Sequence, residues 1–134
     1  MKIDYIDPPG SVPAQGLYTS VGHVAGDQYR FVAGQLSVNA AGDIVGTGDF
    51  DAQFDQVFGN LKGVIEGLGG TMASVVKFTT FTTSRDYIQP FMDKRAAHFP
   101  EWYPSGIFPP NTLLIVQGLV KPEFILEVEA VVAI

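Results

Sequence analysis

The chain has 134 residues, of which 46% are hydrophobic and 16% charged, and its formal net charge is −6. This length and apolar content predict a single domain over residues 1–134 with a buried core, and they exclude a disordered chain. The acidic balance argues against nucleic-acid partners, and the absence of cysteine excludes disulfides, thiolate catalysis and Cys-based zinc sites.

The first residues and the apolar runs of the sequence indicate the cellular location to expect. Residues 1–10 contain Pro and Asp where a signal peptide would have an apolar run. No apolar stretch approaches the length of a membrane span. We therefore expect a soluble, cytoplasmic protein with no membrane partner.

The first third of the chain is expected to contain a β-hairpin. Residues 1–15 hold three prolines and are predicted to form an extended lead-in. Residues 17–24 and 29–33 are predicted strands, and the intervening Gly26–Asp27 pair indicates a turn. A loop punctuated by glycine follows over residues 39–48.

Residues 49–68 show the clearest helical pattern. Asp49 suits the N-cap and a Gly-Gly pair ends the segment. Gly59, Gly63 and Gly67 recur every four residues, which predicts a helix face lying close to a sheet. The apolar residues at helical spacing are Phe50, Phe54, Val57, Phe58, Leu61, Val64, Ile65 and Leu68.

The second half supplies three more strands and one more helix. Residues 75–82, 112–120 and 124–133 are predicted strands, and residues 100–110 form a loop rich in proline and aromatic residues. A helix is expected to open near Ser84, with Pro90 in its first turn. Its stripe is Ile88, Phe91, Met92, Arg95, Ala96 and Phe99. The order ββαβαββ predicts an α+β fold in which two helices cover one face of a mixed sheet.

The last strand places two carboxylates on one face. Alternation puts Glu127 and Glu129 on the side opposite an entirely apolar set. Either Glu meets water or a basic residue of another chain, or one Glu lies in a cleft between subunits and handles a proton. A sheet face that no helix covers predicts an interface, which copies of the chain would close in a cyclic oligomer.

Other signals of chemistry are weak. His23 lies in an expected strand and His98 near a helix end, and neither has clustered acidic partners, so no metal site is predicted. The Gly-rich residues 42–48 lack the Lys-Ser/Thr that a phosphate-binding loop needs.

An ordered series of short motifs carries a family resemblance. The motifs are residues 31–39 (FVAGQLSVN), 42–45 (GDIV), 53–61 (QFDQVFGNL), 75–81 (VVKFTTF) and 126–130 (LEVEA). Over residues 17–134 the chain resembles the RidA/YjgF family of enamine/imine deaminases. The resemblance implies a chorismate-mutase-like fold, a homotrimer with a central barrel, and clefts between subunits. It also implies hydrolysis of small reactive imines to a keto acid and ammonia without a cofactor.

The family's functional positions carry over unevenly. Glu127 matches the carboxylate that positions the attacking water, and Tyr18 matches the cleft tyrosine. The backbone of Ala33 and Gly34 matches a Ser-Gly-Gln turn, and Phe91 falls where the family has asparagine.

The stretch that grips the substrate carboxylate departs from the family pattern. The Pro-x-Arg-Ser motif reads Pro-Pro-Asn-Thr here, with Asn111 in place of the arginine and Thr112 after it. An arginine fork makes two charge-assisted hydrogen bonds where asparagine offers one neutral amide, a loss of about 1.5–3 kcal/mol. The standard amino-acid-derived imine is therefore a poor candidate substrate. Phe91, Trp102 and Tyr103 indicate an aromatic pocket and a ring-bearing substrate, unless Trp102 and Tyr103 form a hydrophobic plug beneath a loop.

Three functions remain open from the sequence. The first is a deaminase of a small imine or enamine with Glu127 orienting water. The second is a non-catalytic trimer that binds a small metabolite and regulates a partner. The third is the nuclease or translation-inhibitor activity sometimes attributed to the family, which the acidic balance makes least expected.

Overall fold

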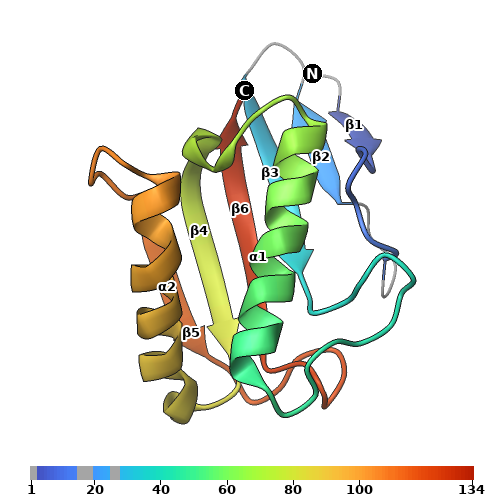
Figure 1. Ribbon diagram of the computed structural model, residues 1–134. Coiled ribbons are helices and arrows are strands. Elements are labelled where there is room, and N and C mark those ends of the chain that lie inside the picture. Colours follow the sequence, from blue (N-terminus) through green and yellow to red (C-terminus); the bar gives the residue numbers. More distant parts are fainter. Residues whose placement is uncertain (1–2, 15–19, 25–27) are drawn as a thin grey trace.

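A computed structural model describes residues 3–14, 20–24 and 28–134. One six-stranded sheet has the order β1-β2-β3-β6-β4-β5, and both helices cover the same face of it (Figure 1). The strands are β1 (Ile3–Ile6), β2 (Val21–Val24), β3 (Tyr29–Gln35), β4 (Val75–Thr82), β5 (Asn111–Ile115) and β6 (Leu126–Ala133). The helices are α1 (Phe50–Gly67) and α2 (Ile88–Trp102), with short 3-10 turns at Met72–Ser74 and Arg85–Tyr87.

The sheet is mixed because of one strand pair. β6 lies at the centre, antiparallel to both β3 and β4, whereas β4 and β5 run parallel. The predicted α+β fold, with two helices on one face of a mixed sheet, is thereby confirmed.

The strands differ from expectation at the sheet's two edges. Residues 1–15, predicted as an extended lead-in, contain β1, which pairs with β2. β5 ends at Ile115 instead of residue 120, because its partner β4 ends at Thr82, opposite Ile115. The predicted strand residues 17–19 and the Gly26–Asp27 turn lie outside the described residues.

Helix α1 packs its apolar stripe against the sheet. Its N-cap Asp49 accepts a hydrogen bond from the Ala52 N–H at 3.1 Å, as predicted. Its apolar stripe is buried against the sheet, and Leu68 packs at the margin of that core. The sheet residues buried in the same core are Val21, Val32, Val75, Phe78, Leu126, Val128, Ala130 and Val132.

Two buried amides of α1 hold the segments that precede β6 and follow β3. Gln53 donates to the carbonyl of Glu123 at 2.7 Å and accepts from the Ile125 N–H at 3.0 Å. Asn60 donates to the carbonyls of Leu36 and Val38 at 3.0 and 2.9 Å. These bonds satisfy backbone groups that would otherwise be buried unpaired, so the two side chains set the paths entering β6 and leaving β3.

Two of the spaced glycines of α1, Gly63 and Gly67, face the N-terminal segment and not the sheet, which corrects the prediction. A Cβ on Gly67 would overlap the carbonyl oxygen of Pro9, and one on Gly63 would lie 3.2 Å from the Gly10 oxygen. A Cβ on Gly59 would meet nothing within 4 Å. The sheet-facing side of the helix is filled by its large apolar residues, so only the outer flank lets the chain cross closely.

Helix α2 starts after a 3-10 turn that Ser84 caps, with Pro90 in its first turn as predicted. The helix continues through Pro100 to Trp102, a part of the chain predicted as loop. Buried Phe99 and Trp102, whose ring is 5.6 Å from that of Phe58, hold this last turn. Within the described residues, neither α1 nor α2 combines the length and hydropathy that crossing a bilayer requires.

Alanine at positions 67 and 59 should have opposite effects on stability. Gly67→Ala should lower the free energy of unfolding by about 1–3 kcal/mol, because the new methyl group displaces the crossing segment. Gly59→Ala should raise it by up to about 1 kcal/mol through helix propensity alone. Urea denaturation of both variants checks this, and equal effects would contradict the close crossing at Gly67.

Candidate functional site

The alternation of β6 separates its apolar and charged residues as predicted. Leu126, Val128, Ala130 and Val132 are buried beneath the helices. Glu127 is half-buried and Glu129 exposed on the opposite face, here called the open face. Across the strand pair Glu127 faces Phe81, and Glu129 faces Thr79.

Glu127 lies directly against the backbone of β3. Between Val32 and Gln35 the β3 strand holds one more residue than β6 opposite it, which is a β-bulge. Gly34 lies in this bulge, and a Cβ there would be 2.8 Å from Glu127 Cδ and 2.9 Å from its Oε1. A side chain at position 34 would force the carboxyl group out of this position, so two predicted site residues, Gly34 and Glu127, are brought together by the glycine. Ala33 is the other residue of the bulge.

The surroundings of Glu127 favour its protonated form. Burial raises the pKa of the carboxyl group above its ordinary value, and the charge of Glu129 raises it further. Among the described residues, no Lys, Arg or His forms an ion pair with either carboxylate. A carboxyl group with a raised pKa is better matched to accepting and returning a proton near neutral pH.

The open face carries large apolar side chains that its own helices do not cover. Tyr29 and Phe31 of β3 are 50% and 51% exposed, and Leu114 of β5 is 39% exposed. On this face, Phe31, Lys77 and Glu129 line a hollow with a volume of about 100 Å³. That volume is well below the roughly 300 Å³ at which ligand pockets begin.

Asn111 and Thr112 point to opposite faces of the sheet. Asn111 pairs with Phe78 and accepts a hydrogen bond from the Thr80 hydroxyl at 2.8 Å, on the helix side. Thr112 pairs with Thr79 and so shares the open face with Glu127. Asn111 and Glu127 therefore cannot contact one small substrate within a single chain.

The predicted aromatic residues lie between the helices and the sheet. Phe91 is 2% exposed, with its ring centroid 5.7 Å from that of Phe54. Trp102 stacks on Phe58, and the Tyr103 hydroxyl donates to the Met72 carbonyl at 2.9 Å. Within the chain these rings do not face Glu127. Tyr103 is part of the hydrophobic core and Trp102 packs against it, which agrees with the alternative of a hydrophobic plug beneath a loop.

Tyr18, the remaining predicted contact, lies outside the described residues. Phe81 and Thr79, which flank the two carboxylates, were not singled out in the sequence. The alternation of Lys77, Thr79 and Phe81 along β4 is the signal, but it requires the β4–β6 register to be read.

The described residues offer no ready metal site. Residues 3–14, 20–24 and 28–134 contain no group of three His, Asp or Glu side chains placed to hold an ion. His98 Nε2 lies 3.6 Å from Asp55 Oδ1, a carboxylate that Lys94 contacts at 2.7 Å.

The raised pKa of Glu127 predicts a pH-dependent stability difference. Since the folded state binds this proton more tightly, unfolding becomes easier as pH rises from the ordinary glutamate pKa to the raised value, and then levels off. Glu127→Gln lacks this contribution, so its advantage in free energy of unfolding over the wild type should grow through that window. Urea denaturation at several pH values and one protein concentration measures it. Parallel pH curves for the two proteins would contradict the prediction.

Comparison with known proteins places this chain in a family. The family model described as Endoribonuclease L-PSP matches residues 11–134. RidA from an Antarctic Psychrobacter is 25% identical, with 98% of this chain and 99% of that chain covered and a TM-score of 0.83. The YjgF gene product of E. coli is 25% identical, with 97% and 98% covered and a TM-score of 0.82.

E. coli TdcF, solved with bound serine, shares the fold at 23% identity, with 97% and 98% covered and a TM-score of 0.82. The family match spans nearly the whole chain and agrees with the sheet order, the helix placement and the motif series. The chain therefore belongs to the RidA/YjgF family, the family described as Endoribonuclease L-PSP.

Proposed function

We propose that this chain hydrolyses a small reactive imine or enamine, and that Glu127 positions the attacking water. One observation carries the proposal: a half-buried carboxyl group with a raised pKa lies over Gly34 on the uncovered face of the sheet. Family membership supports imine chemistry or small-molecule binding at such a group.

The reaction needs only proton transfers and water. Glu127 takes a proton as the water oxygen bonds to the imine carbon, and the C=N electron pair moves to nitrogen, which gains a proton. The C–OH proton then passes through the carboxylate to the amine nitrogen, the C–N bond breaks as the carbonyl forms, and ammonia leaves. General acid–base help of this kind is worth about 10²–10⁴ in rate, and no step calls for a cofactor.

The site is proposed to be complete only in a homotrimer in the cytoplasm. Tyr29, Phe31 and Leu114 leave apolar surface exposed on the open face, and copies of the chain that close on this face in a ring are its proposed occupant. Packing open faces together would desolvate Glu127 further. Because β5 is an edge strand, the β5 edge of one copy would border the open face of the next and bring its Asn111 toward that copy's Glu127. The cleft so formed would also include Ala33 and Thr112.

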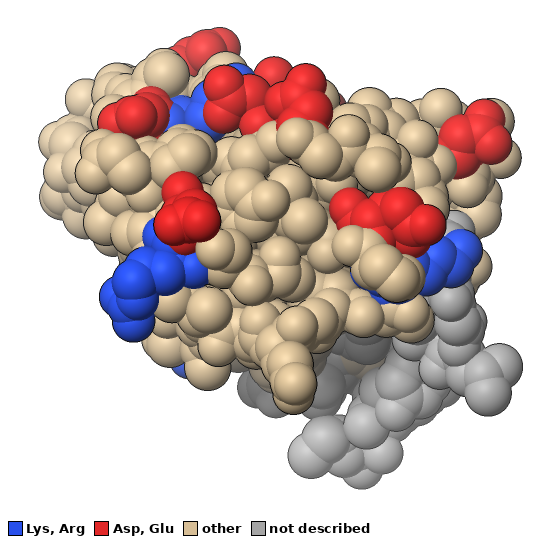
Figure 2. Space-filling view, turned by 90° about the horizontal axis from the view of Figure 1, so that it is seen from below, with Lys and Arg blue, Asp and Glu red and all other residues tan. Residues whose placement is uncertain are grey.

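A second candidate is a trimer that binds a small metabolite without turning it over. E. coli TdcF was solved with bound serine, so a protein of this fold can hold a small molecule. Nuclease activity gains no such support. On the face in Figure 2, the described Lys and Arg side chains lie beside Asp and Glu and form no continuous basic surface.

Glu127→Gln should lower turnover by a factor of about 10²–10⁴, because it keeps the shape of the side chain and removes its basicity. Glu129→Gln serves as the matched control and should affect turnover much less. Ammonia release from a panel of imines generated in solution measures both. Ammonia release that Glu127→Gln leaves unchanged would rule out the catalytic role, and binding without release by the wild type would favour the second candidate.

The assembly has its own test. Light scattering of the wild type should give three times the 14.4 kDa chain mass. Phe31→Asp should dissociate the trimer, because it places a charge in the middle of the open face. Ala97→Asp, on the exposed side of α2, should not. A wild-type monomer at micromolar concentration, or a trimer that survives Phe31→Asp, would refute this packing.

A further inference from the structure

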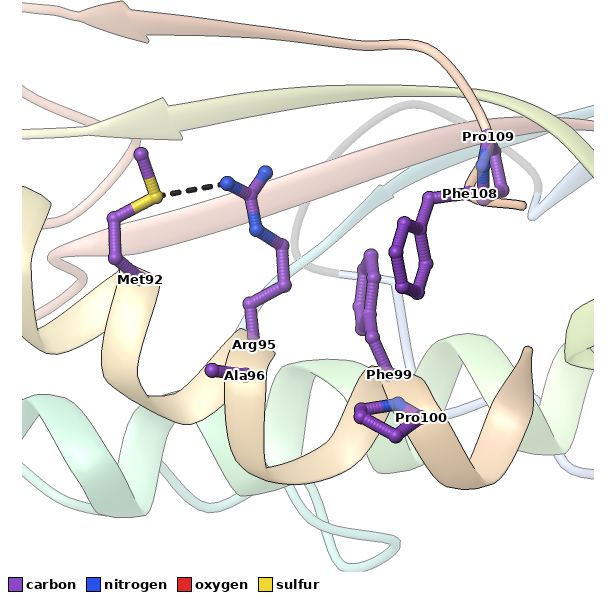
Figure 3. A pocket seen from close by; sticks show the side chains of 7 residues that line it. All are labelled: Met92, Arg95, Ala96, Phe99, Pro100, Phe108 and Pro109. Carbon is purple, nitrogen blue, oxygen red and sulfur yellow. Dashed lines mark hydrogen bonds between the residues drawn. The ribbon is translucent and has the colours of Figure 1, made fainter. Parts of the chain in front are cut away.

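A second pocket lies on the helix side of the sheet, away from Glu127. It has a volume of about 530 Å³ and opens between α2 and the residues that lead into β5 (Figure 3). This is within the roughly 300–1,000 Å³ of small-molecule sites. The residues that line it are Met92, Arg95, Ala96, Phe99, Pro100, Phe108 and Pro109.

Among the described residues that line this pocket, only Arg95 is charged, and its guanidinium points from α2 toward the strands (Figure 3). Its hydrogen-bond partner is the thioether sulfur of Met92 at 2.8 Å, and its Cζ lies 5.3 Å from the Phe91 ring. Among the described residues, no carboxylate lies within ion-pair distance of it. By contrast, the neighbouring Lys94 contacts Asp55.

A guanidinium in this position has unused binding capacity. It carries five N–H donors, and a thioether is a weak acceptor for one of them. The aromatic rings beside it keep part of the group away from water, which strengthens its attraction for an anion. The chemistry that best completes it is a carboxylate, which can accept two parallel hydrogen bonds.

The walls of the pocket define the rest of the ligand. Phe99 and Phe108 lie with ring centroids 6.1 Å apart, and Met92 and Phe108 are exposed. Together with the two prolines they offer an apolar, largely aromatic surface. A ring-bearing carboxylate would place its charge on Arg95 and its ring against these walls.

We propose that the Arg95 pocket binds a carboxylate with an aromatic or apolar body, and that Arg95 supplies the cation that position 111 lacks. Pro109 lines the pocket two residues before Asn111, so the two positions lie on adjoining surfaces. The proposal that the pocket binds a carboxylate depends only on the geometry of the pocket and of Arg95. That its ligand is also the substrate of Glu127 rests on the proposed function and on a neighbouring copy presenting its Glu127.

Benzoate, with benzamide as its uncharged counterpart, tests the site directly. The chain has three methionines, and the Met92 methyl lies beside the guanidinium, so ¹³C-methyl methionine NMR reports on the pocket. Met92→Leu identifies the Met92 signal. Benzoate should shift it in a saturable manner and bind more tightly than benzamide. An unshifted Met92 signal at millimolar benzoate would overturn the proposal.

Variants separate charge from fold. Arg95→Gln should weaken benzoate about 10- to 100-fold and leave benzamide binding unchanged, whereas Arg95→Lys should keep part of the affinity. Lys62→Gln, which removes an exposed cation on α1, should change neither. Unchanged benzoate affinity in Arg95→Gln would overturn the proposal. If Arg95→Gln does not fold, the proposal would be overturned by a benzoate affinity of Arg95→Lys equal to that of the wild type. These readouts need no turnover, so they fail or succeed independently of Glu127 chemistry.

Discussion

One constraint shapes the whole molecule: both helices cover the same face of the sheet (Figure 1). The central strand β6 must then be apolar on one side only. Val128 and its alternate neighbours are buried under α1, while Glu127 and Glu129 face the side that the chain's own helices leave open. In a single chain, water hydrates the two carboxylates on that side and keeps their free-energy cost low. When a neighbouring copy removes part of that water, the carboxyl pKa rises and the group becomes better suited to exchanging a proton.

The backbone, and not a cation, sets the position of Glu127. The bulge in β3 brings Gly34 under the carboxyl group, where any side chain would collide with it. With burial as the main cause and Glu129 as the second, the pKa of Glu127 rises. The buried amides Gln53 and Asn60 tie α1 to the chain on either side of these strands, which keeps the bulge and β6 in register.

Helical spacing, capping residues and strand alternation predicted the features of the fold that depend on residues close together in the sequence. The stripe of α1, its Asp49 cap and the alternation around Glu127 are all visible in the sequence. The face on which Asn111 lies depends on the parallel β4–β5 register, which no local pattern reveals. Phe91 was assigned to a pocket through resemblance, although its place in a helical stripe already indicated a buried position. The same stripe contained Arg95, and a charged residue among apolar ones was the signal for the second pocket.

The central claim is that Glu127 is a partly desolvated carboxyl group able to exchange a proton. ¹³C NMR of side-chain carboxyl groups in the assembled protein, with the Glu127 signal assigned by its loss in Glu127→Gln, measures this directly. The account predicts that Glu127 titrates above the ordinary glutamate range and that Glu129→Gln lowers its pKa, because the neighbouring charge is the second cause of the shift. A Glu127 signal that titrates as an ordinary exposed glutamate would contradict it.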